Sequence, residues 1–154
     1  MRCFQHKSGV LQATLLTINF LAIYRALQLY FYDFRTAIGP SMIPTIRQGK
    51  IYIAGDVLLV DKLTPSIWGY QINDIVLAKS PMKLGSLLCK RIMGVAGDII
   101  VHEGTEYLIP EGHVWIEGDN KSQSFDSRNF GPIPLSLLDG RIIIKLWNWP
   151  EIFI

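Results

Sequence analysis

The chain of 154 residues has few of the side chains that hold metals or build disulfide frameworks. It contains two cysteines, Cys3 and Cys89, and three histidines, and neither residue type shows the spacing of a metal site. The scattered histidines also offer no Ser-His-Asp arrangement. We therefore expect no metal centre and no hydrolase triad of the usual kind.

A strong charge of one sign is also missing. The formal net charge is +2, and no run of lysines and arginines forms a basic stripe. The sequence therefore does not indicate binding to nucleic acid. Its length predicts one modest domain with at most one appendage.

The appendage is predicted at residues 9–32, which are mostly apolar. About 20 apolar residues cross a bilayer as a helix. Arg25 and Gln28 weaken this interpretation, although an arginine near one end of a span extends its charge to the interface. The aromatic residues 30–32 are typical of an interfacial belt. We predict one transmembrane anchor, with a cleaved signal peptide and a buried amphipathic helix as the alternatives.

Beyond Arg35 the pattern changes to short runs of branched apolar residues separated by Gly, Pro, Asn and Asp. This pattern predicts a mainly β domain, which we place at residues 36–149, with loops at 64–70 and 81–86. Pairs such as Gly118-Asp119 are best interpreted as turns. The predicted strands include residues 57–60, 75–78, 87–92, 99–101, 113–116 and 141–146.

Ser41 lies in the stiff segment Gly-Pro-Ser-Met-Ile-Pro-Thr, residues 39–45. The ring of Pro40 fixes its own φ, and Pro44 restricts the residue before it. A hydroxyl on such a backbone is aimed at a substrate with little ordering cost. The alternative is an ordinary loop serine, because Pro, Gly and Ser are common turn residues.

Lys90 lies in the otherwise apolar run 87–94, where strand alternation places Lys90 and Arg91 on opposite faces. One of the two must face inward or along a cleft. A lysine acts as a base near neutral pH only if burial lowers its pKa. Serine with lysine is a known variant of the hydrolytic constellation. The alternative is a strand lysine that extends to solvent.

Residues 118–128 gather hydroxyls and carboxylates around Arg128. Such a loop is able to position a base through hydrogen bonds. The alternative is a solvated turn in which Asp126 and Arg128 form an exposed ion pair worth less than about 1 kcal/mol.

These three stretches resemble, in order and spacing, the conserved boxes of the type I signal peptidases. The boxes are residues 41–45, residues 90–98 and residues 118–128, and the resemblance covers residues 39–147. The chain is short and lacks the large inserted domain of many bacterial relatives. In this it is most similar to the subunit 1 type of the mitochondrial inner membrane proteases. The resemblance implies an antiparallel β catalytic domain after one transmembrane helix.

The resemblance also implies roles for individual residues. Ser41 would be the nucleophile, Lys90 its general base, and Ser124 the hydroxyl that hydrogen-bonds the lysine amine. Asp126 and Arg128 would form a structural pair that supports the site. No cofactor is implied.

The surroundings of the nucleophile include one departure from some family members. Met42 would line the substrate cleft. Some members carry a serine two places before the nucleophile, where this chain has Gly39. The oxyanion would then depend mainly on the backbone N–H of Ser41.

The implied function is that of a membrane-bound serine endopeptidase of the mitochondrial inner membrane, with its catalytic domain facing the intermembrane space. It would remove sorting or signal peptides from precursor proteins. Its partners would be a second, related catalytic subunit in a heterodimer and a small accessory subunit. The alternatives are a compact bacterial signal peptidase I and a non-catalytic membrane-anchored subunit. A self-cleaving regulator is disfavoured because an apolar stretch stands where it would need a DNA-binding domain.

Overall fold

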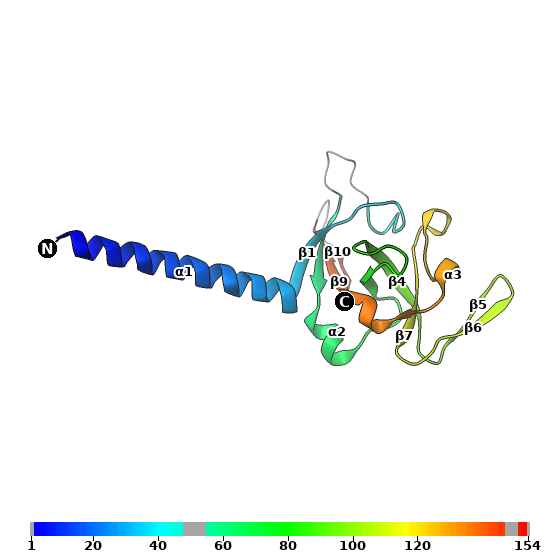
Figure 1. The fold of residues 1–154 in the computed structure, drawn as a ribbon. Helices are drawn as coiled ribbons and strands as arrows, with labels where there is room; N and C mark the ends of the chain where they lie inside the picture. Colours follow the sequence, from blue (N-terminus) through cyan, green and yellow to red (C-terminus); the bar gives the residue numbers. More distant parts are fainter. Residues whose placement is uncertain (1, 48–54, 147–150, 154) are drawn as a thin grey trace.

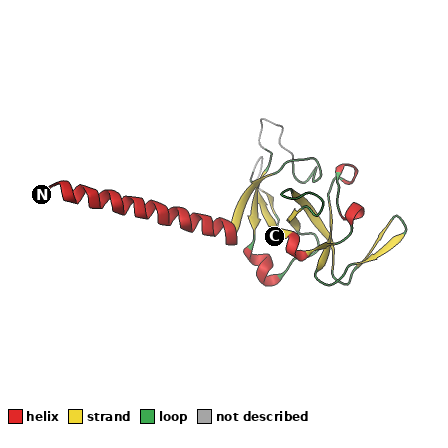
Figure 2. Ribbon diagram, in the orientation of Figure 1, coloured by secondary structure: helices red, strands yellow, loops and turns green. Residues whose placement is uncertain are grey.

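The computed structural model describes residues 2–47, 55–146 and 151–153. A long helix, α1 (Arg2–Tyr30), leads into a β domain and projects away from it (Figure 1). The other helices of the described chain are short and lie around the sheet (Figure 2). They are α2 (Leu63–Trp68), η1 (Lys121–Gln123), α3 (Ser127–Phe130) and η2 (Leu135–Leu137).

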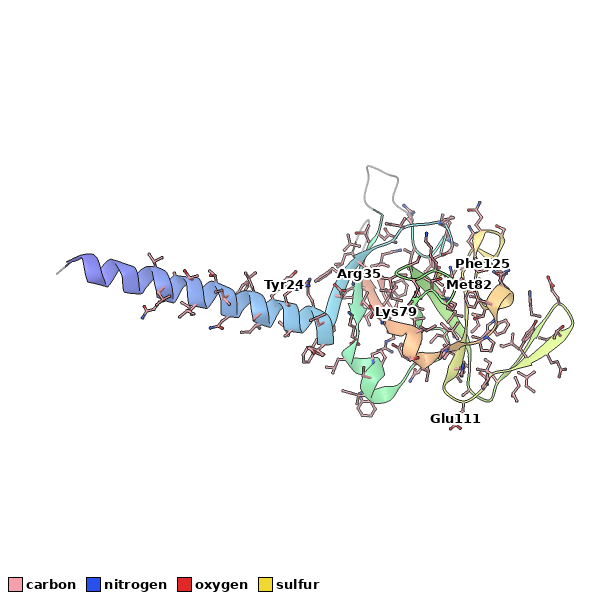
Figure 3. The ribbon with its side chains drawn as sticks, in the orientation of Figure 1. Tyr24, Arg35, Lys79, Met82, Glu111 and Phe125 are labelled. Carbon is pink, nitrogen blue, oxygen red and sulfur yellow. The ribbon has the colours of Figure 1, made fainter. Side chains whose placement is uncertain are left out.

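Helix α1 contains a candidate membrane span at Gly9–Tyr30, with a mean hydropathy of 1.5 and no part buried in the protein. Most of this span projects away from the β domain, and near its end Tyr24 lines a pocket with Phe34 and Ile143 of the β domain (Figure 3). The alternative of a buried amphipathic helix is therefore wrong. Polar groups near the end of the span bond along the helix. Arg25 Nη1 donates to Gln28 Oε1 at 3.4 Å, and Gln28 Nε2 donates to Tyr24 Oη at 2.9 Å.

The β domain is built around one antiparallel sheet with the strand order β1-β2-β9-β3-β4-β7-β8, and β10 pairs with β9. A separate antiparallel hairpin, β5–β6, extends from the end of the domain opposite α1 (Figure 1). The strands are β1 (Tyr32–Thr36), β2 (Val57–Asp61), β3 (Ile75–Lys79), β4 (Leu87–Val95), β5 (Ile99–His102), β6 (Thr105–Leu108), β7 (His113–Glu117), β8 (Ile133–Pro134), β9 (Leu138–Lys145) and β10 (Glu151–Ile152). The mainly antiparallel β fold and its preceding apolar helix confirm the predicted fold class.

Strand β3 lies in the middle of the sheet and separates two apolar clusters. Its alternate side chains face opposite sides, as the period of a strand requires. Ile75 and Leu77 belong to one cluster, and Val76 and Ala78 belong to the other. The first cluster also includes Met42 and Ile46 of the segment that contains Ser41, together with Ala37, Leu58, Val60 and Ile142.

All six strands named from the sequence are confirmed, whereas β1, β6, β8, β10 and the short helices of the β domain were not predicted. Helix α2 occupies most of the expected loop 64–70. The Asp61 carboxylate accepts hydrogen bonds from Leu63 N and Thr64 N, both at 3.0 Å, and so satisfies N–H groups that a helix start leaves free. Strand β1 pairs with β2 from Tyr32 onward, which places residues 32–36 in the sheet. The end of the predicted domain, residues 147–149, lies outside the described residues.

Candidate active site

Ser41 lies in a turn that follows β1 and packs onto the first apolar cluster. Gly39 has φ +101°, a conformation that favours glycine over any residue with a side chain. A serine at this position would therefore be strained in the backbone conformation seen here. Met42 is 2% exposed and packs in the core, so its side chain attaches the turn to the β domain. Contact between Met42 and a substrate stays a prediction.

The loop after β7 is joined to this turn by three hydrogen bonds. Asn120 N donates to Ser41 O at 2.9 Å, and Asn120 Nδ2 donates to Pro40 O at 3.1 Å. Thr45 Oγ1 donates to Asp119 Oδ2 at 2.5 Å. The structure thus brings the Ser41 segment against residues 118–120, which are more than 70 positions away in the sequence.

Lys90 is the inward-facing member of the Lys-Arg pair on β4, and its residue is 3% exposed. Arg91 points the other way, where its Nε and Nη2 donate to the two Asp119 carboxylate oxygens at 2.9 and 2.8 Å. The predicted alternation of the two side chains is confirmed. A solvent-extended Lys90 is excluded by its burial.

The pKa of Lys90 is lowered from its ordinary value of 10.5, and burial is the main cause. The negative charge of Asp126 opposes this shift, whereas the positive charge of Arg128 adds to it. Within the described part of the chain, no hydrogen bond or ion pair of the Lys90 amine is found. The buried environment therefore favours the neutral form of the Lys90 amine more strongly than an aqueous environment would.

Asp126 is the centre of a buried hydrogen-bond network. Its carboxylate accepts from Gly118 N at 2.9 Å, from Ser124 Oγ at 2.5 Å, and from Arg128 Nε and Nη2, both at 2.8 Å. It also caps the start of α3. The ion pair between Asp126 and Arg128 is present, but it is buried and not exposed as the alternative of a solvated turn supposed, although residues 121–123 of the same loop are exposed.

Ser124 uses its only proton in the bond to Asp126. Its remaining lone pairs accept hydrogen bonds, so Ser124 is able to receive an N–H from a lysine amine but not to donate to one. The structure places Ser124 beside Gly118, which also faces Ser41 O. A contact between Ser124 and Lys90 stays a prediction.

Asp126→Asn should lower the free energy of unfolding most at neutral pH. Burial alone would raise the pKa of Asp126, but bonds from Arg128, Gly118 and Ser124 outweigh it and hold the pKa at about 2. A carboxylate with an unfolded pKa of about 3.9 then contributes about 2 to 3 kcal/mol at pH 7. That contribution is present above pH 4 and disappears as the pH falls through 2.

The measurement is urea unfolding of the detergent-solubilised chain at pH 7 and at pH 3, followed by tryptophan fluorescence. The difference between the wild type and Asp126→Asn should shrink at pH 3. Glu106→Gln, on the exposed face of the β5–β6 hairpin, is the matched control. An equal difference at both pH values would contradict the pKa argument.

Four residues near Ser41 were not identified as site residues from the sequence: Thr45, Gly118, Asp119 and Asn120. The Gly-Asp pair has the composition of an ordinary turn, and no local spacing signals that it lies against a segment near residue 41. A Cβ at Gly118 would lie 2.5 Å from Ser41 O and 2.6 Å from Ser124 Cβ. Only glycine fits this position without a shift of its neighbours.

In the part of the chain that the structure describes, no group of three potential ligands could hold a metal ion.

The family model described as "Signal peptidase, peptidase S26" matches residues 10–109 and 101–147. Mitochondrial inner membrane protease subunit 1 of Mus musculus is 44% identical over 119 residues, 73% of this chain and 68% of the relative. The protein of the same name from Schizosaccharomyces pombe is 32% identical over 94% of this chain and 92% of its own length. Mitochondrial inner membrane protease subunit 2 of Danio rerio is 39% identical over 74% of this chain and 65% of its own length.

The family match covers most of helix α1 and nearly all of the β domain, and it includes Ser41, Lys90 and the Asp126 network. The predicted resemblance to subunit 1 of the mitochondrial inner membrane protease is confirmed by relatives of that name. The chain therefore belongs to the signal peptidase family S26.

Proposed function

We propose that this S26 peptidase is a membrane-bound serine endopeptidase in which Ser41 is the nucleophile and Lys90 the general base. The observation that supports this most is the burial of Lys90. A fully exposed lysine would be protonated at neutral pH, whereas burial lowers the pKa of Lys90. No other strand lysine or histidine of the sequence lies in one of the family boxes.

In the proposed reaction, neutral Lys90 takes the proton of Ser41 Oγ as that oxygen attacks the scissile carbonyl. The Ser41 N–H donates to the oxyanion of the tetrahedral intermediate. Protonated Lys90 then gives its proton to the leaving amine, and an acyl-enzyme remains. Lys90 next takes a proton from water, whose oxygen attacks the ester carbonyl. Protonated Lys90 then returns this proton to Ser41 Oγ as the ester C–O bond breaks, which restores both residues. Ser124 would hold the amine in place by accepting one of its N–H groups.

The proposed substrates are precursor proteins whose sorting or signal peptides lie at a membrane. Helix α1 is long and apolar enough to hold the β domain at a bilayer surface. The names of the relatives favour the mitochondrial inner membrane. The catalytic domain would face the intermembrane space and would work beside a second catalytic subunit, with a small accessory subunit. The subunit 2 name of one relative supports such an assembly. Because both Ser41 and Lys90 are present, a non-catalytic subunit is disfavoured.

The test compares cleavage of a panel of inner-membrane precursors in membranes that carry the wild type or Ser41→Ala at equal protein levels. Precursors that remain uncut only with Ser41→Ala are the expected result, and they identify the substrates. Ser66→Ala, on the exposed side of α2, should cleave like the wild type. Full cleavage by Ser41→Ala would overturn the proposal.

A further inference from the structure

Asn120 contacts both peptide groups that flank Ser41. Its backbone N–H donates to Ser41 O at 2.9 Å, and its side-chain Nδ2 donates to Pro40 O at 3.1 Å. The other end of the Asn120 side chain is also held, because Ser122 Oγ donates to Asn120 Oδ1 at 3.0 Å. This bond assigns the amide orientation, with its NH₂ group toward Pro40.

The bond to Pro40 O has a consequence for the N–H of Ser41. In a trans peptide the C=O and the N–H lie in one plane and point in opposite directions. The cis peptide bond found among the described residues is Ile43-Pro44, so the peptide between Pro40 and Ser41 is trans. Pro40 O also accepts a longer bond from Ile43 N at 3.3 Å, within the turn itself. The Asn120 side chain, at 3.1 Å, adds a second restraint on this carbonyl and so on the direction of the Ser41 N–H, on the side away from Asn120.

The Ser41 N–H is the donor on which the reaction depends most. Gly39 has no hydroxyl, and its φ of +101° disfavours any residue that could supply one. No partner of the Ser41 N–H is found in residues 2–47, 55–146 and 151–153. A donor stabilises an oxyanion best when it is oriented before the reaction begins, since reorganisation would otherwise add to the barrier.

We propose that Asn120 is a positioning residue that orients the Ser41 N–H toward the oxyanion by holding the carbonyl on the opposite side of the same peptide. This inference rests on the proposed function of Ser41. In this proposal Asn120 acts through Pro40 O and not through contact with the substrate. Its contribution should therefore appear in the transition state and not in the binding of the substrate.

The experiment measures kcat and KM of the full-length chain in proteoliposomes with a membrane-anchored reporter that carries a precursor cleavage site. The variants are Asn120→Asp, which keeps the size but loses the donor to Pro40 O, and Ser122→Ala, which removes the orienting bond. Gln123→Ala is the matched control, because this amide side chain is exposed on the same short helix η1. A second readout is the affinity for a peptide boronate, whose adduct with Ser41 Oγ places an oxygen at the oxyanion position.

Asn120→Asp should lower kcat by about 10- to 100-fold, with KM changed by less than about threefold. The boronate affinity should fall by a factor similar to that of kcat. Ser122→Ala should produce the same pattern with a loss of about two- to fivefold, and Gln123→Ala should match the wild type. If Asn120→Asp does not fold, as judged by its thermal unfolding midpoint, Ser122→Ala decides the question.

The proposal is overturned if the folded variants keep the wild-type kcat. It is equally overturned if they change KM alone, or if they lose kcat without losing boronate affinity. A general loosening of the turn would instead move the unfolding midpoint, KM and kcat together. Failure of the underlying proposed function is distinguishable, because the wild type itself would then neither cleave the reporter nor form the Ser41 adduct.

Discussion

Lys90→Met should abolish cleavage while the fold stays as stable as the wild type or becomes more stable. The amine is buried, and its pKa is lowered mainly by that burial, so a charged Lys90 costs the folded state free energy. Methionine has a similar length and removes this cost. General-base catalysis contributes about 10²- to 10⁴-fold, and the loss in kcat/KM should be at least this large.

The measurement pairs cleavage kinetics in proteoliposomes with the thermal unfolding midpoint. Lys79→Met is the matched control, because Lys79 is an exposed lysine at the end of neighbouring strand β3 and is labelled in Figure 3. Lys90→Arg should also be inactive, since a guanidinium does not lose its proton in a protein. Retention of wild-type kcat/KM by Lys90→Met would show that another group is the base.

The pH dependence follows from the same shift. The folded pKa of Lys90 is below its ordinary value of 10.5, so the neutral, active form should persist to lower pH than for an exposed lysine. Between the two pKa values the unfolded chain binds the proton more tightly, and stability therefore rises with pH in that window. Lys90→Met should remove this rise in stability.

Gly118→Ala should lose most of its activity, because the added methyl group has no space. Its Cβ would lie 2.5 Å from Ser41 O, a backbone atom, and 2.6 Å from Ser124 Cβ. The contact would push Ser41 away from its position or displace Ser124 from Asp126. A displacement of about 1 Å can cost about 100-fold in rate, and we expect a fall of that size in kcat.

Gly94→Ala is the matched control for the added methyl group. Gly94 also lies in the sheet, but its Cβ would meet the ends of the Ile109 and Ile100 side chains, at 2.7 and 3.1 Å, and no backbone atom of the Ser41 turn. Gly94→Ala should therefore lose some stability and keep its kcat. Wild-type kinetics for Gly118→Ala would show that the space beside Ser41 O accommodates a methyl group, which contradicts the close packing of Gly118.

The fold was largely predictable because its signals are local. The strands are short apolar runs between turn residues, and the candidate membrane span is a single apolar stretch. The alternation of Lys90 and Arg91 predicted that one of them faces inward, and the burial of Lys90 confirms this. Helix α2 was missed because residues 64–70 have the composition of a loop. The start of the helix is held by the Asp61 carboxylate, which accepts hydrogen bonds from Leu63 N and Thr64 N, and the composition did not reveal this contact.

The contacts that hold the Ser41 turn were not predictable, because they join distant segments. Nothing near Thr45 in the sequence indicates that its hydroxyl meets Asp119. Asn120 similarly has the local sequence of a turn, and its bonds to Pro40 and Ser41 depend on the strand order of the sheet. The family boxes nevertheless identified the segments that come together, although not the bonds between them.

The most direct measurement is rapid quenching of the wild type with an ester substrate, followed by intact-mass analysis and peptide mapping. We expect an acyl group on Ser41 that accumulates before hydrolysis and is absent when Lys90→Met is used. An acyl group on another residue, or its undiminished formation with Lys90→Met, would contradict the assignment of Ser41 and Lys90.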